Sequence, residues 1–189
     1  ELHEWLNDEG KLETMFLSDI VESAMQTIVH SLVTKRLVHE RYGVDPVYLP
    51  FSIYRPWSAA ELSPSRREAS RARLAMPAGE IVIATFGFVQ NSKAPIECVW
   101  ALQMLHSWGI RASLHFVGEF QDRHVPGLRM LIDKLGLSEH VRLAHDFVTE
   151  QTYRDYLLAA DLAIQLRTYG LGGLSGAVLD CAAAGMPTV

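Results

Sequence analysis

The chain has 189 residues with a formal net charge of −5, and hydrophobic and charged residues make up 49% and 21% of it. This length and ordinary composition predict a globular protein with a sizeable core, built as one large domain or as one domain with part of another. The acidic balance argues against a broad nucleic-acid-binding face, which is normally basic. No apolar run reaches the roughly 20 residues of a membrane-spanning helix.

The two cysteines, Cys98 and Cys181, fall in predicted helices, where a free cysteine behaves as a small hydrophobe. Their number and context favour a reducing compartment and argue against a disulfide framework. The chain begins at Glu1 without a signal peptide and stops as a strand begins, so we expect a segment cut from a longer protein.

Residues 1–52 show a helix–strand–helix–strand rhythm without a hairpin signal. The second helix is the best defined, because Ser31 is a good N-cap for a helix over residues 32–42 and Gly43 fits the position that ends it. We expect this helix to bury one apolar side, formed by Leu32, Val33, Leu37 and Val38.

Between residues 53 and 77 the periodic pattern gives way to prolines, serines and aromatic residues, which is typical of an interdomain linker. A basic helix is predicted within this stretch, over residues 66–74. Its arginines are expected to form a solvated face rather than a binding patch.

From residue 78 onward strands alternate with helices, which predicts βαβ units: a Rossmann-like α/β fold with a parallel sheet and helices on both faces. The strands are expected at residues 81–86, 112–117, 141–143 and 162–166, and the helices at 94–108, 125–135, 150–160 and after the glycines of 170–176. The first of these helices is expected to turn inward Ile96, Val99, Trp100, Leu102 and Leu105.

Ligands of parallel sheets bind beyond the carboxyl ends of the strands. The loops at that edge contain Lys93, Arg167 and the glycine-rich stretch 170–176, which precedes a helix. Glycines let the backbone approach a phosphate, and the N–H groups and dipole of a helix N-terminus favour an anion. The residues therefore predict a phosphate-binding site made of two cations and one helix N-terminus.

Histidine is the residue type that most invites a metal hypothesis. His30, His115 and His145 each end or flank a predicted strand, but no pair of them has the spacing of metal ligands. We expect structural roles for them, and we expect no metal site.

Four short motifs follow one another in the second half of the chain, at residues 86–93, 116–119, 156–161 and 185–189. The first stands where one family has Gly-Arg-x-x-x-x-Lys-Gly, and the others correspond in order to its strand ending in Val-Gly, its Tyr-x-x-Ala-Asp and its Gly-x-Pro-Val-Val. The chain from about residue 27 onward thus resembles the family 4 retaining glycosyltransferases (glycosyl transferases group 1). Their GT-B fold consists of two Rossmann-like domains that face a cleft.

The resemblance implies three parts. Residues 1–52 would end the N-terminal, acceptor-side domain, residues 53–77 would be a linker and connecting helix, and residues 78–189 would be the C-terminal nucleotide-sugar-binding domain, truncated at its C-terminal end. Because much of such an enzyme lies outside these parts, we expect the isolated chain to be inactive.

The resemblance also implies an activity: transfer of a sugar from a nucleotide-diphosphate sugar to an acceptor hydroxyl with retention, without a cofactor or metal ion. The acceptor would be a glycan or a lipid-linked molecule, in polysaccharide or lipopolysaccharide biosynthesis, with no role for nucleic acid. The resemblance implies that the full-length protein is cytoplasmic, and it is compatible with peripheral association at the inner face of the membrane.

The site residues carried over by the resemblance fall into three groups, and no catalytic residue is assigned. The donor diphosphate would be bound by Lys93, Arg167, Gly172, Gly173, Ser175 and Gly176, the ribose by Asp180, and the base would lie near Gly118, His145, Asp146 and Phe147.

Two departures from the family pattern leave alternatives open. The acid that contacts the donor sugar should fall at Gly172 or Gly173, and the arginine beside the first glycine is Phe88, a loss for which Arg167 is the hypothesised replacement. A degenerate, non-catalytic domain that binds a nucleotide or a partner is one alternative, and a nucleotide-sugar epimerase is another. The base, sugar, acceptor and linkage are not defined by the sequence.

Overall fold

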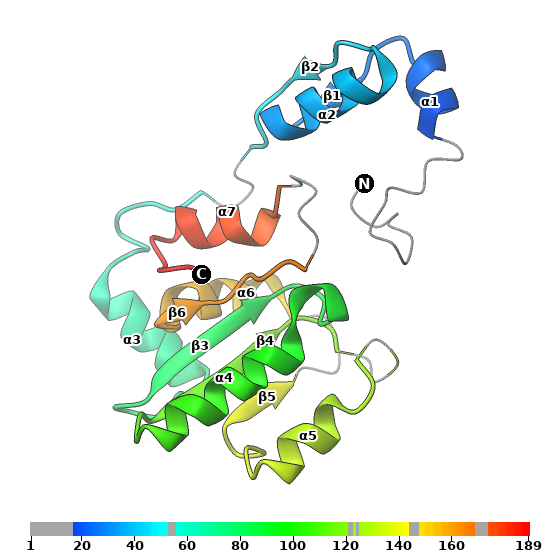
Figure 1. Ribbon diagram of the computed structural model, residues 1–189. Helices are drawn as coiled ribbons and strands as arrows, with labels where there is room; N and C mark the ends of the chain where they lie inside the picture. Colours follow the sequence, from blue (N-terminus) through cyan, green and yellow to red (C-terminus); the bar gives the residue numbers. More distant parts are fainter. Residues whose placement is uncertain (1–16, 53–55, 121–122, 124, 144–147, 169–173) are drawn as a thin grey trace. The chain divides into compact units, whose positions relative to one another are not determined.

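A computed structural model describes residues 17–52, 56–120, 123, 125–143, 148–168 and 174–189. The chain forms two compact units (Figure 1), one of residues 1–52 with 169–175 and one of residues 53–168 with 176–189. The roles predicted for the three parts of the chain stay predictions. Among the described residues, no helix combines the length and the apolar character needed to cross a membrane.

The first unit contains a small parallel sheet with two helices. Its elements are α1 (Leu17–Ser23), β1 (Ile28–Val29), α2 (Leu32–Tyr42) and β2 (Val47–Tyr48). The predicted ends of α2 are confirmed: the Thr34 N–H donates to Ser31 Oγ at 2.9 Å, and Gly43 ends the helix with a φ of 68°. Residues 28 and 29 pair with residues 47 and 48 in parallel register.

The predicted buried side of α2 is mostly wrong. Only Val38 is buried, in a small core with Val21 and Val29. Leu32, Val33 and Leu37 are 65%, 44% and 41% exposed. Two short strands are too small a surface to cover a broad helix face, so the apolar spacing identified a helix without identifying which positions it buries.

The second unit is built around a four-stranded parallel sheet with the order β5-β4-β3-β6. Its strands are β3 (Ile81–Phe86), β4 (Ala112–Val117), β5 (Val141–Leu143) and β6 (Leu162–Ala163). Its helices are α3 (Pro64–Arg73), the short 3₁₀ turn η2 (Asn91–Lys93), α4 (Pro95–Ser107), α5 (Leu128–Lys134), α6 (Glu150–Ala159) and α7 (Gly176–Ala183). This is the predicted α/β architecture.

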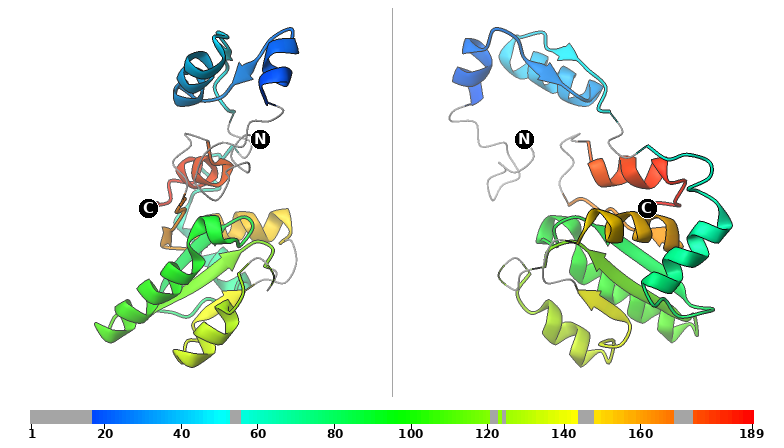
Figure 2. Two further views of the ribbon diagram at one scale, coloured as in Figure 1. Left: turned by 45° about the vertical axis from the view of Figure 1, so that its right-hand side comes forward. Right: turned by 180° about the vertical axis from the view of Figure 1, so that it is seen from behind.

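Helices cover both faces of this sheet because successive residues of a strand point to opposite sides. Ile83 joins a core with α4 and α5, whereas Val82 and Phe86 join a second core with α6 and α7. Figure 2 shows α4 and α5 on one face, with α3 and α6 on the other. The continuous apolar run of β3 is thus explained by burial on both faces.

The ends of several elements differ from the prediction. Strand β6 covers two of the five residues expected to be extended, but the end of the chain lies beside it, in a bridge between Ala163 and Thr188. The strand predicted to begin at the end of the chain is therefore present as this single bridge. The expected inward side of α4 is partly wrong, since Ile96 and Trp100 are 37% and 48% exposed.

Buried cysteine and histidine have the structural roles expected of them. Cys98 and Cys181 are free thiols packed in the two cores. His115 is buried in β4, and its Nδ1 lies 3.2 Å from the Tyr156 hydroxyl oxygen. Burial is the main cause that lowers the pKa of His115 to about 3, so the ring is neutral at physiological pH.

The prediction that the arginines of α3 form a solvated face is wrong for three of the four, which bind carboxylates, whereas Arg66 is exposed. Arg67 and Arg71 both form ion pairs with Asp161, at 2.6 and 3.2 Å. Arg73 binds the buried carboxylate of Asp155 on α6. These carboxylates lie more than 80 residues further along the chain, so no local charge pattern could indicate them.

Candidate functional site

The first group at the carboxyl edge of the sheet is the Lys93 ammonium. The turn after β3 leads through η2 back towards the strand end, where Lys93 Nζ donates a hydrogen bond to the Phe86 carbonyl at 2.8 Å. Gly87 has a φ of 86°, and a Cβ placed on it would lie 2.7 Å from Nζ. A glycine is therefore needed here, both for the backbone conformation and for the approach of the ammonium.

Gly118 has a packing role at the same edge. It follows β4, and a Cβ placed on it would lie 2.3 Å from the carbonyl oxygen of Gly87, far inside normal contact. The Gly87 N–H in turn donates to the Val117 carbonyl at 3.0 Å. This glycine lets the ends of β3 and β4 approach each other; its predicted place near the base stays a prediction.

Replacing Gly118 with alanine should therefore destabilise the second unit. The new methyl group meets backbone atoms, which cannot rotate away, so we expect a loss of about 2 kcal/mol in the free energy of unfolding, measured by urea denaturation. Gly176→Ala is the matched control, because a Cβ there meets nothing within 4 Å. Equal stability of the two variants would contradict the packing role.

The second cation is Arg167, on the segment that follows β6. The Thr168 N–H donates to the Ser92 carbonyl at 2.9 Å, which fixes this segment against η2. Lys93 directly follows Ser92, and Arg167 directly precedes Thr168. The hydrogen bond between Ser92 and Thr168 therefore places Lys93 and Arg167 near each other. Burial and, second, the positive charge of Arg167 lower the pKa of Lys93 to about 8.

Two neighbouring cations make this edge of the sheet favourable for an anion. Partial burial also lowers the pKa of Arg167, although much of its side chain stays exposed. Both charges would be stabilised by a phosphate or another anion between or beside them. The predicted meeting of Lys93 and Arg167 is thus present in the second unit.

Helix α7 adds its N-terminus and one carboxylate. Gly176 is exposed, with open space where a Cβ would lie. Asp180 is only 4% exposed and accepts a hydrogen bond from the Tyr153 hydroxyl at 3.1 Å. The Tyr153 ring packs edge-on against Phe86, with 5.1 Å between centroids. Asp180 is thereby connected to the end of β3, and its ribose contact stays a prediction.

Several predicted site residues cannot be placed. Gly172, Gly173, His145, Asp146 and Phe147 lie outside the described residues. Ser175 is half-buried and belongs to the first unit.

Two polar residues near the site were not predicted from the sequence. Tyr153 was missed because nothing local relates it to Asp180, which lies 27 residues away. Gln165 is 8% exposed, and its amide nitrogen and oxygen have no hydrogen-bond partner among the described residues. A signal for Gln165 does exist: it is the one polar residue within the apolar stretch 162–166.

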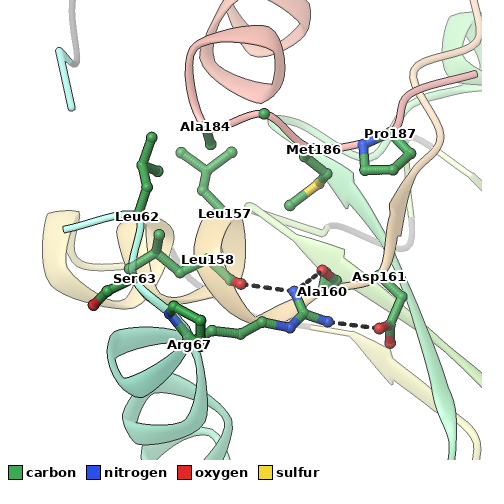
Figure 3. Close-up of a pocket in the computed structure, with 12 residues that line it drawn as sticks. Leu62, Ser63, Arg67, Leu157, Leu158, Ala160, Asp161, Ala184, Met186 and Pro187 are labelled. Carbon is green, nitrogen blue, oxygen red and sulfur yellow. Dashed lines mark hydrogen bonds and ion pairs between the residues drawn. The ribbon is translucent and has the colours of Figure 1, made fainter. Parts of the chain in front are cut away.

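A separate hollow of about 400 Å³ lies at the other end of the strands (Figure 3). Asp161, which lines it, directly precedes β6, so the hollow is at the amino end of that strand. Apolar side chains such as Leu157 and Met186 form much of its wall. Arg67 is already bonded to two carbonyls and to Asp161, so its charge is compensated and the hollow is poorly suited to an anion.

Comparison with known proteins gives a likeness in structure and none in sequence. No protein-family model matches the chain, and no curated protein matches it. Solved structures of glycosyltransferases with the GT-B architecture do match, so the predicted fold is confirmed.

Three of these structures illustrate the likeness. WaaG, a glycosyltransferase involved in lipopolysaccharide biosynthesis, has a TM-score of 0.71 and 22% identity, over 85% of this chain and 42% of its own. Anabaena HepE in complex with UDP and glucose has a TM-score of 0.74 and 20% identity, over 99% of this chain and 50% of its own. Sucrose-phosphate synthase from Thermosynechococcus elongatus has a TM-score of 0.72 and 17% identity, over 98% of this chain and 46% of its own. The chain thus spans about half the length of these structures.

Proposed function

We propose that the chain is the donor-binding part of a retaining family 4 glycosyltransferase, which moves a sugar from a nucleotide-diphosphate sugar to an acceptor hydroxyl. The observation that carries this proposal is the meeting of Lys93 and Arg167 at the carboxyl edge of a GT-B-type sheet. HepE, which shares the fold, was solved with UDP and with UDP-glucose. WaaG, which shares the fold, is involved in lipopolysaccharide biosynthesis, which supports a place in polysaccharide or lipopolysaccharide biosynthesis; the proposed acceptor is a glycan or a lipid-linked molecule.

The chemistry follows from where negative charge develops. When the bond between the sugar and the diphosphate breaks, the leaving oxygen becomes an anion. Lys93 and Arg167 are held in place before this step, so they stabilise the new charge without rearranging. The N-terminus of α7 adds a partial positive charge. Together these groups supply the stabilisation that a metal ion supplies in other transferases, so the proposed reaction needs no metal.

The proposal is tested by titrating the chain with uridine, guanosine, adenosine and thymidine diphosphates while amide chemical shifts are recorded. We expect saturable shifts with one base, at Lys93, Arg167 and residues 176–180. Shifts that saturate with none of the four would contradict a donor site in this chain.

A degenerate, non-catalytic nucleotide-binding domain is a second candidate. It is favoured by the glycines at 172 and 173, where the family has the acid that contacts the donor sugar. The same titration separates the two when the sugar-linked diphosphate is added. A site that retains sugar recognition should bind the nucleotide sugar more tightly than the nucleoside diphosphate, whereas a degenerate site should bind both equally.

A further inference from the structure

The carboxamide of Gln165 lacks what a buried amide normally has. The residue is 8% exposed, and neither Nε2 nor Oε1 finds a hydrogen-bond partner within the part of the chain that the structure describes. Leaving a buried donor or acceptor unpaired destabilises a folded protein, so such groups are rare and need an explanation. Here both ends of one amide lack a partner among the described residues.

The position of Gln165 places this amide in the candidate site. Continuing the register of β6, in which Ala163 is beside Ala84, puts Gln165 beside Phe86. Side chains two residues apart on an extended segment point to the same side, so Gln165 faces the core that contains Ala163 and Phe86.

Phe86, beside which Gln165 lies, is connected to the groups already described. The Phe86 carbonyl binds the Lys93 ammonium, and the Phe86 ring contacts Tyr153, which binds Asp180. Arg167 lies two residues further along the chain. Through Phe86 and the chain segment to Arg167, Gln165 is therefore next to the elements that hold the two cations and the carboxylate of the site.

We propose that the Gln165 carboxamide binds hydroxyl groups of the donor, an inference that rests on the proposed function. Phosphate oxygens only accept hydrogen bonds, so a diphosphate would pair with Nε2 and leave Oε1 unpaired. A pair of sugar hydroxyls both donates and accepts, and so completes both ends of the amide. The hydroxyls are those of the ribose or those of the transferred sugar.

The test is Gln165→Met, which keeps a similar length and removes both polar atoms. Affinity for UDP and for UDP-glucose is measured by calorimetry, and the melting temperature is measured without ligand. We expect about tenfold weaker binding from the loss of two hydrogen bonds, and a melting temperature that is not lowered. The control is Ser113→Ala, because Ser113 Oγ is also buried and has no hydrogen-bond partner in the described part of the chain, but lies at the amino half of β4.

The two sources of the hydroxyls give different results. Weaker binding of both ligands assigns the ribose, and the variant should then bind 2′,3′-dideoxyuridine diphosphate as well as the unchanged protein does. Weaker binding of UDP-glucose alone assigns the transferred sugar.

Three results would overturn the inference: unchanged affinity for both ligands, the same loss of affinity in Ser113→Ala, or a lowered melting temperature of Gln165→Met, which would mean that the amide has an internal partner. If the unchanged protein binds none of the four nucleoside diphosphates, the proposed function itself fails; if it binds one other than UDP, the same comparison is made with that diphosphate and its glucose conjugate.

Discussion

Replacing Lys93 with methionine should weaken the binding of a nucleoside diphosphate by about 10- to 100-fold. The ammonium is held at the carboxyl edge of the sheet by the Phe86 carbonyl, and Gly87 leaves room for it. A hydrogen bond to a charged group contributes about 1.5–3 kcal/mol, which corresponds to this loss of affinity. Titration calorimetry of the two proteins with UDP at pH 7 measures it.

The binding should also depend on pH through the same group. The pKa of Lys93 is lowered from 10.5 to about 8, mainly by burial. As the pH rises through 8 the ammonium is lost, so affinity for the diphosphate should fall between about pH 7 and 9. The Lys93→Met variant should lack this step. An equal dependence on pH in both proteins would contradict the assignment.

The stability of the free chain provides a check on folding. A lysine whose pKa is lowered in the folded state destabilises that state where it is protonated, below pH 8, and this cost disappears as the pH rises towards 10.5. Lys93→Met should therefore not lower the melting temperature at pH 7. Lys134→Met, at an exposed lysine of α5, is the control that should leave affinity unchanged.

Most helices and strands of both units could be predicted from the sequence because their signals are local. The apolar run of β3 and the cap of α2 by Ser31 each depend on residues within a few positions of each other. Burial was harder to predict. Trp100 and Leu37 are apolar and lie at helical spacing, yet nothing in the described residues covers them fully. Helical periodicity cannot tell how far a neighbouring element extends.

The candidate site could be predicted in part for the same reason. Lys93 and Arg167 were expected together because the carboxyl ends of parallel strands share one edge. The hydrogen bond from Tyr153 to Asp180, and the Gln165 amide that has no partner among the described residues, depend on packing between α6, α7 and the segment that includes β6, which only the folded structure shows. The same limit applies to the arginines of α3, whose carboxylate partners are distant in the sequence.

The largest loss of stability is expected for Asp155→Ala, about 3 kcal/mol in the free energy of unfolding. The Asp155 side chain is 5% exposed and joins α6 to α3. It accepts hydrogen bonds from Ser70 Oγ at 2.8 Å, Arg73 Nε at 2.9 Å and Gln151 Nε2 at 3.1 Å. The substitution leaves the fully buried Ser70 hydroxyl without this acceptor, and urea denaturation measures the cost.

Two further variants separate this cluster from an ordinary surface contact. Asp155→Asn keeps an oxygen for Ser70 and should cost less than Asp155→Ala. Asp133 accepts a hydrogen bond from Ser138 at 2.6 Å but is exposed, so Asp133→Ala should change stability by only about 0.5 kcal/mol. If Asp155→Ala and Asp133→Ala had the same effect, the burial of Asp155 would make no contribution to the stability of the fold.

The pH dependence of stability gives an independent measure of the same carboxylate. Burial alone would raise the pKa of Asp155, but the hydrogen bonds from Arg73 and Ser70 outweigh it, so the pKa is lowered in the folded chain. A lowered carboxyl pKa stabilises the fold above the unfolded pKa, and this contribution is lost as the pH falls through the folded value. The unchanged protein should therefore lose stability below about pH 4 more steeply than Asp155→Ala does. Parallel acid profiles would show that the carboxylate is not ionised in the fold, and the ion pair with Arg73 would then not hold α3 on α6.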